Sequence, residues 1–205
     1  MSFLMMEYMK AAAKIDGYWE VFGRELALLH RVGCSHLAKR FGFPEDNYIG
    51  ATPQKNAPMM NWVDFFRERR LLPQIKMAEH YFDANTRGLF TKLSDHLDNY
   101  LSEPERPSLI HGDLWSGNAS TGPDGKAWIY DPAAYVGHHE AELAMTELFG
   151  KNPDEFYRAY NEVYPIDSGY KDRRDLYNLY HLLNHLNLFG GSYLGSVKGI
   201  LGRYV

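Results

Sequence analysis

Three residues whose side-chain oxygen atoms could bind a metal ion lie close together in the sequence, at a spacing suited to phosphoryl transfer. Asp113 and Asn118 stand in the stretch Leu109-Ile-His-Gly-Asp-Leu-Trp-Ser-Gly-Asn118, and Asp131 follows the next apolar run. Phosphoryl transfer from ATP needs a residue that orients the attacking hydroxyl and accepts its proton, and hard oxygen ligands for the Mg²⁺ that bridges the phosphates. We therefore predict Asp113 as the catalytic base and Asn118 and Asp131 as Mg²⁺ ligands.

The second aspartate gives this pattern its weight. An Asp that follows Gly in a turn usually just caps its own backbone, so His-Gly-Asp alone is a weak signal. Asp131 comes after an apolar strand and an intervening turn, which favours a catalytic site over a purely structural one. A near-normal pKa suffices for Asp113, because the transition state is loose and the carboxylate can act by positioning.

Two neighbours of the base have competing interpretations. His111 is typical of a residue that braces the loop, rather than one that carries a proton. Trp115 lies two residues past Asp113, where a side chain can flank the acceptor, but packing in the core explains it equally well.

The elements that must position these residues are mostly helical. Apolar periodicity predicts helices over 14–31, closed by Gly33, over a segment that begins at Asn61 as N-cap, and over 86–101. Pro73 should interrupt the second helix, which resumes to about residue 81. Residues 108–110 and 127–130 should be short strands, the second reached through a turn at 122–125, and the chain from Gly137 onward should be helical. We therefore expect a mainly α (α+β) fold in which one small β-hairpin holds the reactive loop, with residues 41–58 irregular.

Composition excludes several classes of protein. The chain has 205 residues, 45% of them hydrophobic and 23% charged, which fits one globular domain. The net charge of −4 offers no basic surface for nucleic acid, and the single cysteine, Cys34, excludes an intramolecular disulfide or a cysteine metal cage. No apolar run reaches the roughly 18–20 residues that a membrane span requires, and the first residues lack a basic leader. We expect a cytoplasmic protein.

The reactive loop resembles that of the fructosamine kinase (ketosamine 3-kinase) family, which is related to the aminoglycoside and choline kinases within the protein-kinase-like fold. The spacing from Asp113 to Asn118 equals that of the protein-kinase catalytic loop, and Asp131-Pro-Ala falls where the kinase Asp-Phe-Gly motif would be. The resemblance covers nearly the whole chain. It also includes Asp46-Asn-Tyr-Ile-Gly50, Pro53-Gln54, Phe65-Phe-Arg-Glu-Arg-Arg-Leu71, Gly137-His-His-Glu-Ala-Glu-Leu-Ala144 and the segment from Leu176 to Gly190.

The resemblance implies a role for each site residue. Asp113 would be the base, Asn118 and Asp131 would bind Mg²⁺, and Trp115 and His111 would lie at the substrate. Met6, Glu7, Tyr8 and Met9 would form the hinge that reads the adenine of ATP, with the Glu7 carbonyl and the Met9 amide as its partners. The family phosphorylates the 3-hydroxyl of ketoamines, such as fructosamines and ribulosamines, in a deglycation pathway.

The resemblance also implies that residues 1–205 form one domain, the C-terminal lobe of a kinase, with 1–10 as hinge and remnant of the N-terminal lobe. The phosphate-covering loop and the strand lysine would then precede the first residue. The glycines between Gly190 and Gly195 follow a helix, which is the wrong context for such a loop. We expect impaired ATP binding in this chain, because lost positive charge at a transferring phosphoryl group removes a large electrostatic contribution.

Two other functions remain open from the sequence. One is a different small-molecule kinase, of the aminoglycoside or choline type. The other is a non-catalytic kinase-like module that binds a ligand or partner, which the absent lysine favours and the intact Asp113, Asn118 and Asp131 oppose.

Smaller patterns have simpler interpretations. His181 and His185 lie four apart, as zinc ligands do, but their apolar neighbours favour the core or the acceptor cleft. Glu140 and Glu142 are expected to face the positive end of a helix dipole.

Overall fold

A computed structural model describes residues 7–8, 10–32 and 40–205. The helices are α1 (Tyr18–Val32), α2 (Trp62–Phe66), α3 (Leu72–Met77), α4 (Ala84–Asp95), α5 (His139–Leu148), α6 (Asp154–Val163), α7 (Tyr170–Phe189) and α8 (Leu194–Tyr204). The strands are β1 (Asn47–Ile49), β2 (Thr52–Gln54), β3 (Ser108–Ile110), β4 (Ala119–Thr121), β5 (Ala127–Ile129) and β6 (Tyr135–Gly137). The expected mainly helical α+β class is confirmed.

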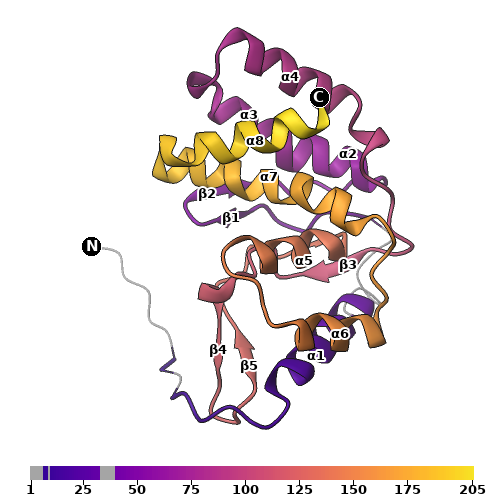
Figure 1. The fold of residues 1–205 in the computed structure, drawn as a ribbon, viewed down its shortest axis with the longest axis vertical. Coiled ribbons are helices and arrows are strands. Elements are labelled where there is room, and N and C mark those ends of the chain that lie inside the picture. The colour runs from indigo at the N-terminus through magenta and orange to yellow at the C-terminus, as the bar shows by residue number, and fades with distance from the viewer. Residues whose placement is uncertain (1–6, 9, 33–39) are drawn as a thin grey trace.

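The helices form two groups with α5 between them. Figure 1 shows α2, α3, α4, α7 and α8 at one end and α1 and α6 at the other, with the β4–β5 hairpin beside α1. Each group has its own apolar core: Trp62, Phe66 and Leu183 belong to the larger, and Phe22, Phe156 and Leu114 to the smaller. Since α5 contributes Ala144 to one core and Leu143 to the other, it joins the two halves.

The strands pair differently from the sequence prediction. Instead of one hairpin there are three two-stranded antiparallel pairs, β1–β2, β3–β6 and β4–β5. The predicted helical region from Gly137 onward begins later, because Gly137 ends β6, and the predicted irregular segment 41–58 contains β1 and β2. Strands of three residues show almost no periodicity, and Pro53 lies within β2, where proline argues against a strand unless it is at an edge.

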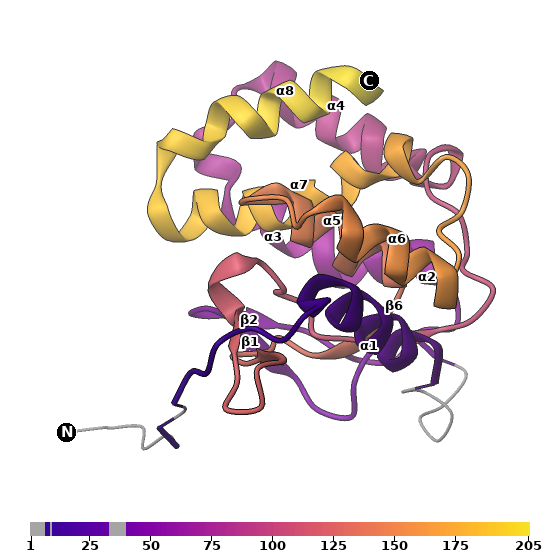
Figure 2. The same cartoon turned by 60° about the horizontal axis from the view of Figure 1, so that its bottom comes forward.

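Helix α1 starts later than predicted and packs closely on α6. It begins at Tyr18 rather than Lys14, after Gly17, which has a φ of +68°. A Cβ on Gly23 would lie 2.2 Å from the carbonyl oxygen of Phe156, so glycine allows the two backbones to meet. Figure 2 shows the helices lying side by side.

The predicted N-cap at Asn61 is correct in position, but its side chain makes no capping bond. The Glu103 carboxylate accepts hydrogen bonds from the Trp62 and Val63 amides at 2.7 and 3.0 Å instead. Pro73 does not interrupt the helical path as predicted. A π-helical turn over Arg67–Leu71 leads into α3, with Pro73 in its first turn, where a missing N–H is tolerated.

The helix predicted over 86–101 is also shifted. It is α4, which begins at Ala84 and ends at Asp95, and a 3₁₀ turn over Leu97–Asn99 follows. Asp83 caps it by accepting a hydrogen bond from the Thr86 amide at 2.7 Å.

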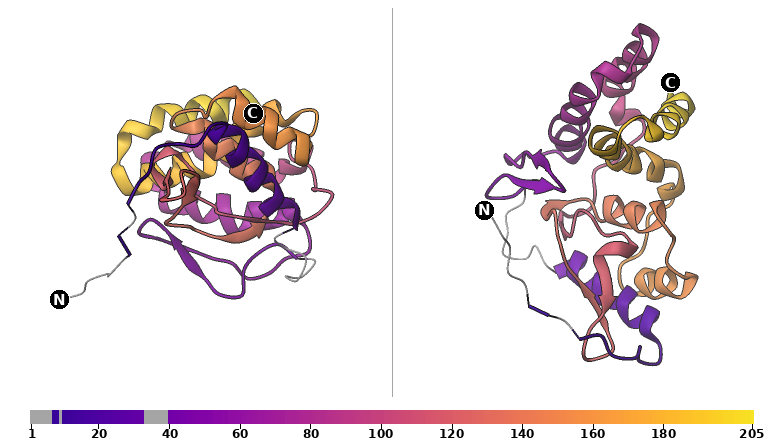
Figure 3. Two further views of the ribbon diagram at one scale, coloured as in Figure 1. Left: turned by 90° about the horizontal axis from the view of Figure 1, so that it is seen from below. Right: turned by 90° about the vertical axis from the view of Figure 1, so that its left-hand side faces the viewer.

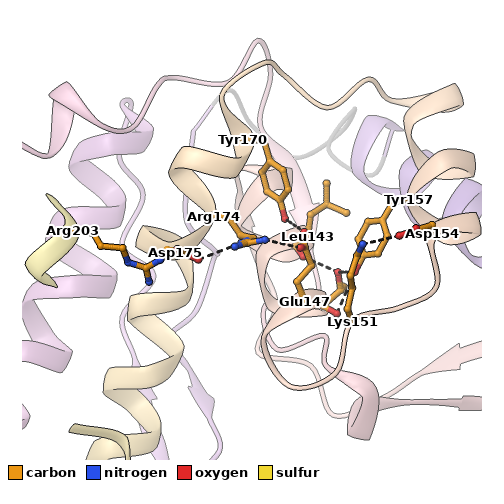
Figure 4. Close-up of polar contacts among 10 residues, drawn as sticks. Leu143, Glu147, Lys151, Asp154, Tyr157, Tyr170, Arg174, Asp175 and Arg203 are labelled. Atoms are coloured by element: carbon orange, nitrogen blue, oxygen red, sulfur yellow. Dashed lines mark hydrogen bonds and ion pairs between the residues drawn. The ribbon is translucent and has the colours of Figure 1, made fainter. Parts of the chain in front are cut away.

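Ion pairs tie the C-terminal helix to the middle of the molecule. Arg203 on α8 contacts Asp175 on α7 at 2.6 Å, and the adjacent Arg174 reaches Glu147 on α5 at 3.0 Å. Glu147 also accepts a hydrogen bond from the Tyr170 hydroxyl. Figure 4 shows this path from α8 across α7 to α5.

Candidate active site

Asp113 and Asn118 are held together by the loop that joins β3 to β4. The Asn118 side-chain amide donates to the backbone carbonyl of Asp113 at 2.8 Å and to its Oδ2 at 3.2 Å. A 3₁₀ turn over Ser116–Asn118 brings the two residues into contact across their five-residue separation. The amide nitrogen of Asn118 faces Asp113, so its Oδ1 is the atom left to bind a cation.

Asp131 follows β5 and lies beside this loop. Its predecessor Tyr130 donates its backbone N–H to the carbonyl of Asn118 at 3.1 Å. Asp131 has a φ of +57°, and among the described residues it is the one non-glycine with positive φ. Aspartate tolerates this left-handed conformation better than most residues, yet such backbone strain is typical of functional sites.

The site raises the proton affinity of the predicted base. Burial raises the pKa of Asp113 to about 7, with further contributions from the nearby negative charges of Glu142 and Asp131, against a lowering by the hydrogen bond from Asn118. The pKa of Asp113 is therefore higher than the near-normal value that would have sufficed for a positioning role. A carboxylate with this proton affinity can accept a proton from a hydroxyl at neutral pH more readily than an exposed aspartate can.

His111 braces the loop from within the protein. Its ring Nδ1 accepts the Asp113 amide at 3.3 Å, which leaves Nε2–H to donate to the Tyr130 carbonyl at 2.9 Å. The ring is buried, and backbone groups engage both of its nitrogens. This geometry matches the bracing role and leaves neither nitrogen free for the substrate contact that the resemblance implied.

Gly112 allows the loop to approach the segment after Asp131. It has a φ of +83°, and a Cβ here would lie 2.2 Å from the carbonyl oxygen of Ala133. Both the conformation and the close contact require glycine at this position.

Glu142 lies in the first turn of α5, as predicted, but its contacts were not predicted. It is 1% exposed, and its carboxylate accepts the backbone N–H groups of His111 and Gly112. Burial favours its neutral form, yet the contacts with His30 and His111 hold its pKa below the usual value. The signal that could have revealed it is the apolar character of Ala141, Leu143 and Ala144 around it.

Glu140 also lies in the first turn of α5, as predicted, and is likewise buried. It forms a two-pronged ion pair with Arg173, with hydrogen bonds of 2.6 and 2.8 Å. Its role is to fix α7 against α5, away from the reactive loop.

Aromatic and imidazole rings form the other wall of the site. Trp115 is 39% exposed and meets Phe149 edge-on, and Phe149 in turn packs on His185. Nδ1 of His181 lies 4.0 Å from Oδ1 of Asp113. Burial lowers the pKa of His181 to about 3, so its ring is neutral.

A cavity lies where the nucleotide-binding hinge was expected. Glu7 and Tyr8 face Trp128 and Tyr130 across a space of about 540 Å³, a size common for small-molecule sites. The backbone N–H of Ala12 donates to the Gly122 carbonyl and that of Ile15 to the Gly125 carbonyl, which bonds residues 12–15 to the turn between β4 and β5. Figure 3 shows the ribbon of this region from two further sides. Met6 and Met9, and also Cys34, lie outside the described residues.

The residues present fit a hard, oxygen-ligated cation such as Mg²⁺. Asp131 makes no side-chain hydrogen bond or ion pair with any described residue, so its carboxylate is available beside Asn118. One carboxylate and one amide oxygen are a common protein contribution to Mg²⁺, which takes its other ligands from water and phosphates. Nowhere in 7–8, 10–32 and 40–205 do three His, Cys, Asp or Glu side chains gather as a metal centre, and His185 bonds the His181 carbonyl instead.

The described helices include none with the length and apolar character to cross a bilayer.

Comparison with known proteins gives one consistent family. Residues 1–205 match the family described as fructosamine kinase. The chain is 42% identical over 202 residues to a probable ketoamine kinase of Synechocystis, and 40% identical over 209 residues to the chloroplastic protein-ribulosamine 3-kinase of Arabidopsis thaliana. These matches cover 98% and 100% of this chain but only 66% and 62% of those relatives.

A solved structure agrees with this result. The crystal structure of a candidate fructosamine-3-kinase from Thermobifida fusca superposes with a TM-score of 0.87 at 38% identity, covering 97% of this chain and 68% of that one.

Proposed function

Because the chain belongs to the fructosamine kinase family, we propose that the protein transfers the γ-phosphoryl group of ATP to a hydroxyl of a ketosamine. The observation that carries this proposal is the grouping of Asp113, Asn118 and Asp131 around one loop. Their side chains supply a base and two oxygen ligands at the same place, as phosphoryl transfer requires.

Asp113 orients the attacking hydroxyl and takes its proton. The hydroxyl oxygen forms a bond to the γ-phosphorus, the bond from that phosphorus to the ADP oxygen breaks, and the proton moves to the Asp113 carboxylate. Asn118 keeps the carboxylate in place through its two hydrogen bonds to Asp113. When bound, Mg²⁺ neutralises charge that develops on the phosphates, and Asn118 and Asp131 would hold it.

The acceptor enters on the side of Trp115 and His181. The exposed indole of Trp115 offers an apolar face to the carbon skeleton of a sugar, and Phe149 and His185 extend that surface. A neutral His181 near Asp113 can form a hydrogen bond with a sugar hydroxyl without adding charge. We assign the 3-hydroxyl as the acceptor from the family, and deglycation as the purpose.

The nucleotide would bind between the hinge and β5. Glu7, Tyr8, Trp128 and Tyr130 line a cavity large enough for a base. We propose Met6, Glu7, Tyr8 and Met9 as the hinge and residues 1–205 as the C-terminal lobe of a kinase.

The test is an acceptor panel with ATP and Mg²⁺. Fructosamine and ribulosamine derivatives are compared with choline and an aminoglycoside, and phosphorylated products are identified by mass spectrometry and ³¹P NMR. We expect phosphate on the 3-hydroxyl of the ketosamines. Preferred transfer to choline or the aminoglycoside would assign a different small-molecule kinase, and nucleotide binding without any transfer would favour a non-catalytic module.

A further inference from the structure

A cluster of side-chain amides, buried at Gln54 and Asn56 and partly buried at Asn47, lies against the segment that follows Asp131. Gln54 on β2 donates to the Ala133 carbonyl at 3.0 Å, and Asn47 on β1 donates to the Ala134 carbonyl at 2.8 Å. Gln54 lies 79 positions before Ala133, and Asn47 lies 87 positions before Ala134. The side chains of Asn47 and Gln54 form no hydrogen bond with Asp113 or Asn118 among the described residues. The β1–β2 hairpin therefore contacts the segment through side chains that reach its backbone.

The hydrogen bonds within this cluster fix the direction in which each amide points. Gln54 Nε2 also donates to Asn47 Oδ1 at 2.8 Å, and Asn56 Nδ2 donates to the same oxygen at 2.9 Å. The Tyr180 hydroxyl donates to Gln54 Oε1 at 2.6 Å, and Arg70 donates to Asn56 Oδ1 at 2.8 Å. Because Nε2 of Gln54 donates to both Ala133 and Asn47 and its Oε1 accepts from Tyr180, rotating its amide by half a turn would break the hydrogen bonds that it makes.

The segment is therefore bonded on both sides of Asp131. Before it, the Tyr130 carbonyl accepts from His111, and after it, the Ala133 and Ala134 carbonyls accept from Gln54 and Asn47. Between these points lies the left-handed conformation of Asp131. A conformation of this kind persists only where the surroundings hold it from several directions.

Packing alone does not explain the amide cluster. Gln54 and Asn56 are almost fully buried, and burying amides contributes little net stability compared with an apolar core of the same shape. The amides instead fix the orientation of two backbone carbonyls, those of Ala133 and Ala134, in the segment after Asp131.

From these contacts we infer that Asn47 and Gln54 are positioning residues that hold Asp131 in the conformation in which its carboxylate can bind the metal. This inference rests on the proposed function, since it takes Asp131 as a ligand. It predicts that metal affinity depends on hairpin side chains that never touch the metal.

The decisive variant is Asn47→Asp. The new carboxylate keeps the oxygen that accepts from Gln54 and Asn56 but cannot donate to Ala134. Its added negative charge alone would attract a cation, whereas loss of positioning would weaken binding. The matched control is Lys55→Met, which changes the net charge by the same amount on the same hairpin and removes only an ion pair with Asp46 at the surface.

Mn²⁺ binding in the presence of ADP is measured by electron paramagnetic resonance of the free ion. We expect the Asn47→Asp variant to bind about 10–100-fold more weakly than the wild type, as is common when a group that orients a metal ligand is removed. Lys55→Met should stay within about 2-fold, because its ion pair is exposed. Gln54→Glu, which loses the donor to Ala133 but keeps the acceptor for Tyr180, should weaken binding as Asn47→Asp does.

Amide hydrogen exchange without metal or nucleotide gives a second, independent readout. Exchange in residues 131–137 should be several-fold faster in Asn47→Asp and Gln54→Glu, while residues 119–129 should exchange as in the wild type. This readout needs no bound metal and also identifies any variant that has unfolded as a whole.

Asp131→Asn separates the inference from the proposed function. If Asp131→Asn abolishes Mn²⁺ binding but both hairpin variants bind and exchange like Lys55→Met, the positioning role is wrong. If Asp131→Asn binds Mn²⁺ as the wild type does, the metal role assigned to Asp131 is wrong, whatever the hairpin variants do.

Discussion

The carboxylate of Asp113 owes its properties to residues that do not react. Its pKa of about 7 arises from burial and from the charges of Glu142 and Asp131, and its orientation is set by Asn118. Glu142 acts on the backbone of the same loop by accepting two of its N–H groups. At the scale of single residues, the site is therefore a loop whose backbone is held by the buried carboxylate of Glu142.

Replacing Glu142 with glutamine tests this support. The Glu142→Gln variant keeps the shape but loses the charge that favours both hydrogen bonds, and its –NH₂ group cannot accept. We expect the free energy of unfolding to fall by about 1.5–3 kcal/mol, the range for hydrogen bonds to charged groups, measured by urea denaturation. An unchanged midpoint and slope would show that the carboxylate does not stabilise the loop.

Replacing Gly112 with alanine tests the close approach of the Asp113 loop to the segment that follows Asp131. In Gly112→Ala, the left-handed backbone and the contact with the Ala133 carbonyl are both unfavourable. Together they should cost about 2–5 kcal/mol of stability in thermal unfolding. Gly88→Ala, on α4 with open space around it, is the control and should have no destabilising effect. Equal behaviour of the two variants would contradict the packing described here.

At the scale of elements, helix starts are set by contacts that sequence spacing only partly reveals. The position of Asn61 as the N-cap of α2 follows from local composition, and the structure confirms it. The true capping group, Glu103, lies 41 residues from Trp62, and no local pattern could identify it. Asp83 was missed for the opposite reason: the predicted start at residue 86 lay two residues later than Ala84, although a capping residue preceded it.

The two candidate caps of α2 give a direct comparison. Glu103→Ala removes the acceptor for two backbone N–H groups and should destabilise the protein by about 1–2 kcal/mol in chemical denaturation. Asn61→Ala removes a side chain without a capping bond and should cost less than about 0.5 kcal/mol. The reverse order of the two effects would contradict the capping assignment.

The cap of α4 makes a pH-dependent contribution. The Thr86 amide, the Thr86 side chain and then Lys198 lower the pKa of Asp83 from 3.8 to about 2. A carboxyl group whose pKa is lower in the folded state than in the unfolded state stabilises the folded state at a pH above its unfolded pKa. This stabilisation is lost as the pH falls through the pKa of the folded state. The difference in melting temperature between wild type and Asp83→Asn should therefore be constant above about pH 5 and shrink between about pH 4 and 2.

Asp95, at the other end of α4, provides the control for that titration. Asp95→Asn removes the same charge from the same helix at a residue that is not its N-cap, so it controls for the change in net charge. A difference between wild type and Asp83→Asn that stays constant down to pH 2 would contradict the role of Asp83.

At the scale of the whole molecule, contacts between residues near in sequence were easier to predict than the architecture. The grouping of Asp113, Asn118 and Asp131 follows from side-chain type and spacing along one short stretch, whereas their proposed chemistry stays a prediction. The β3–β6 pairing and the amide cluster of Asn47 and Gln54 could not be predicted, because they depend on contacts between distant, three-residue strands. The place of Glu142 in the first turn of a helix was predicted, but its hydrogen bonds to the His111 and Gly112 amides were not, because they join residues about 30 positions apart.

The two helical groups meet at the reactive loop. Leu114 lies in the smaller core, and the adjacent Asp113 faces His181 on α7 of the larger group. Asp113 and His181 thus come from different halves joined by α5, so the arrangement of the halves sets the distance between their side chains.

The most direct test of the account is phosphate transfer from ATP-Mg²⁺ to a fructosamine by the wild type and by Asp113→Asn, with ADP binding to each measured in parallel. We predict transfer by the wild type and a loss of at least about 100-fold in the variant, the contribution typical of a positioned base, with ADP binding unchanged. Equal transfer by the two proteins would contradict the role of Asp113 and with it the active site described here.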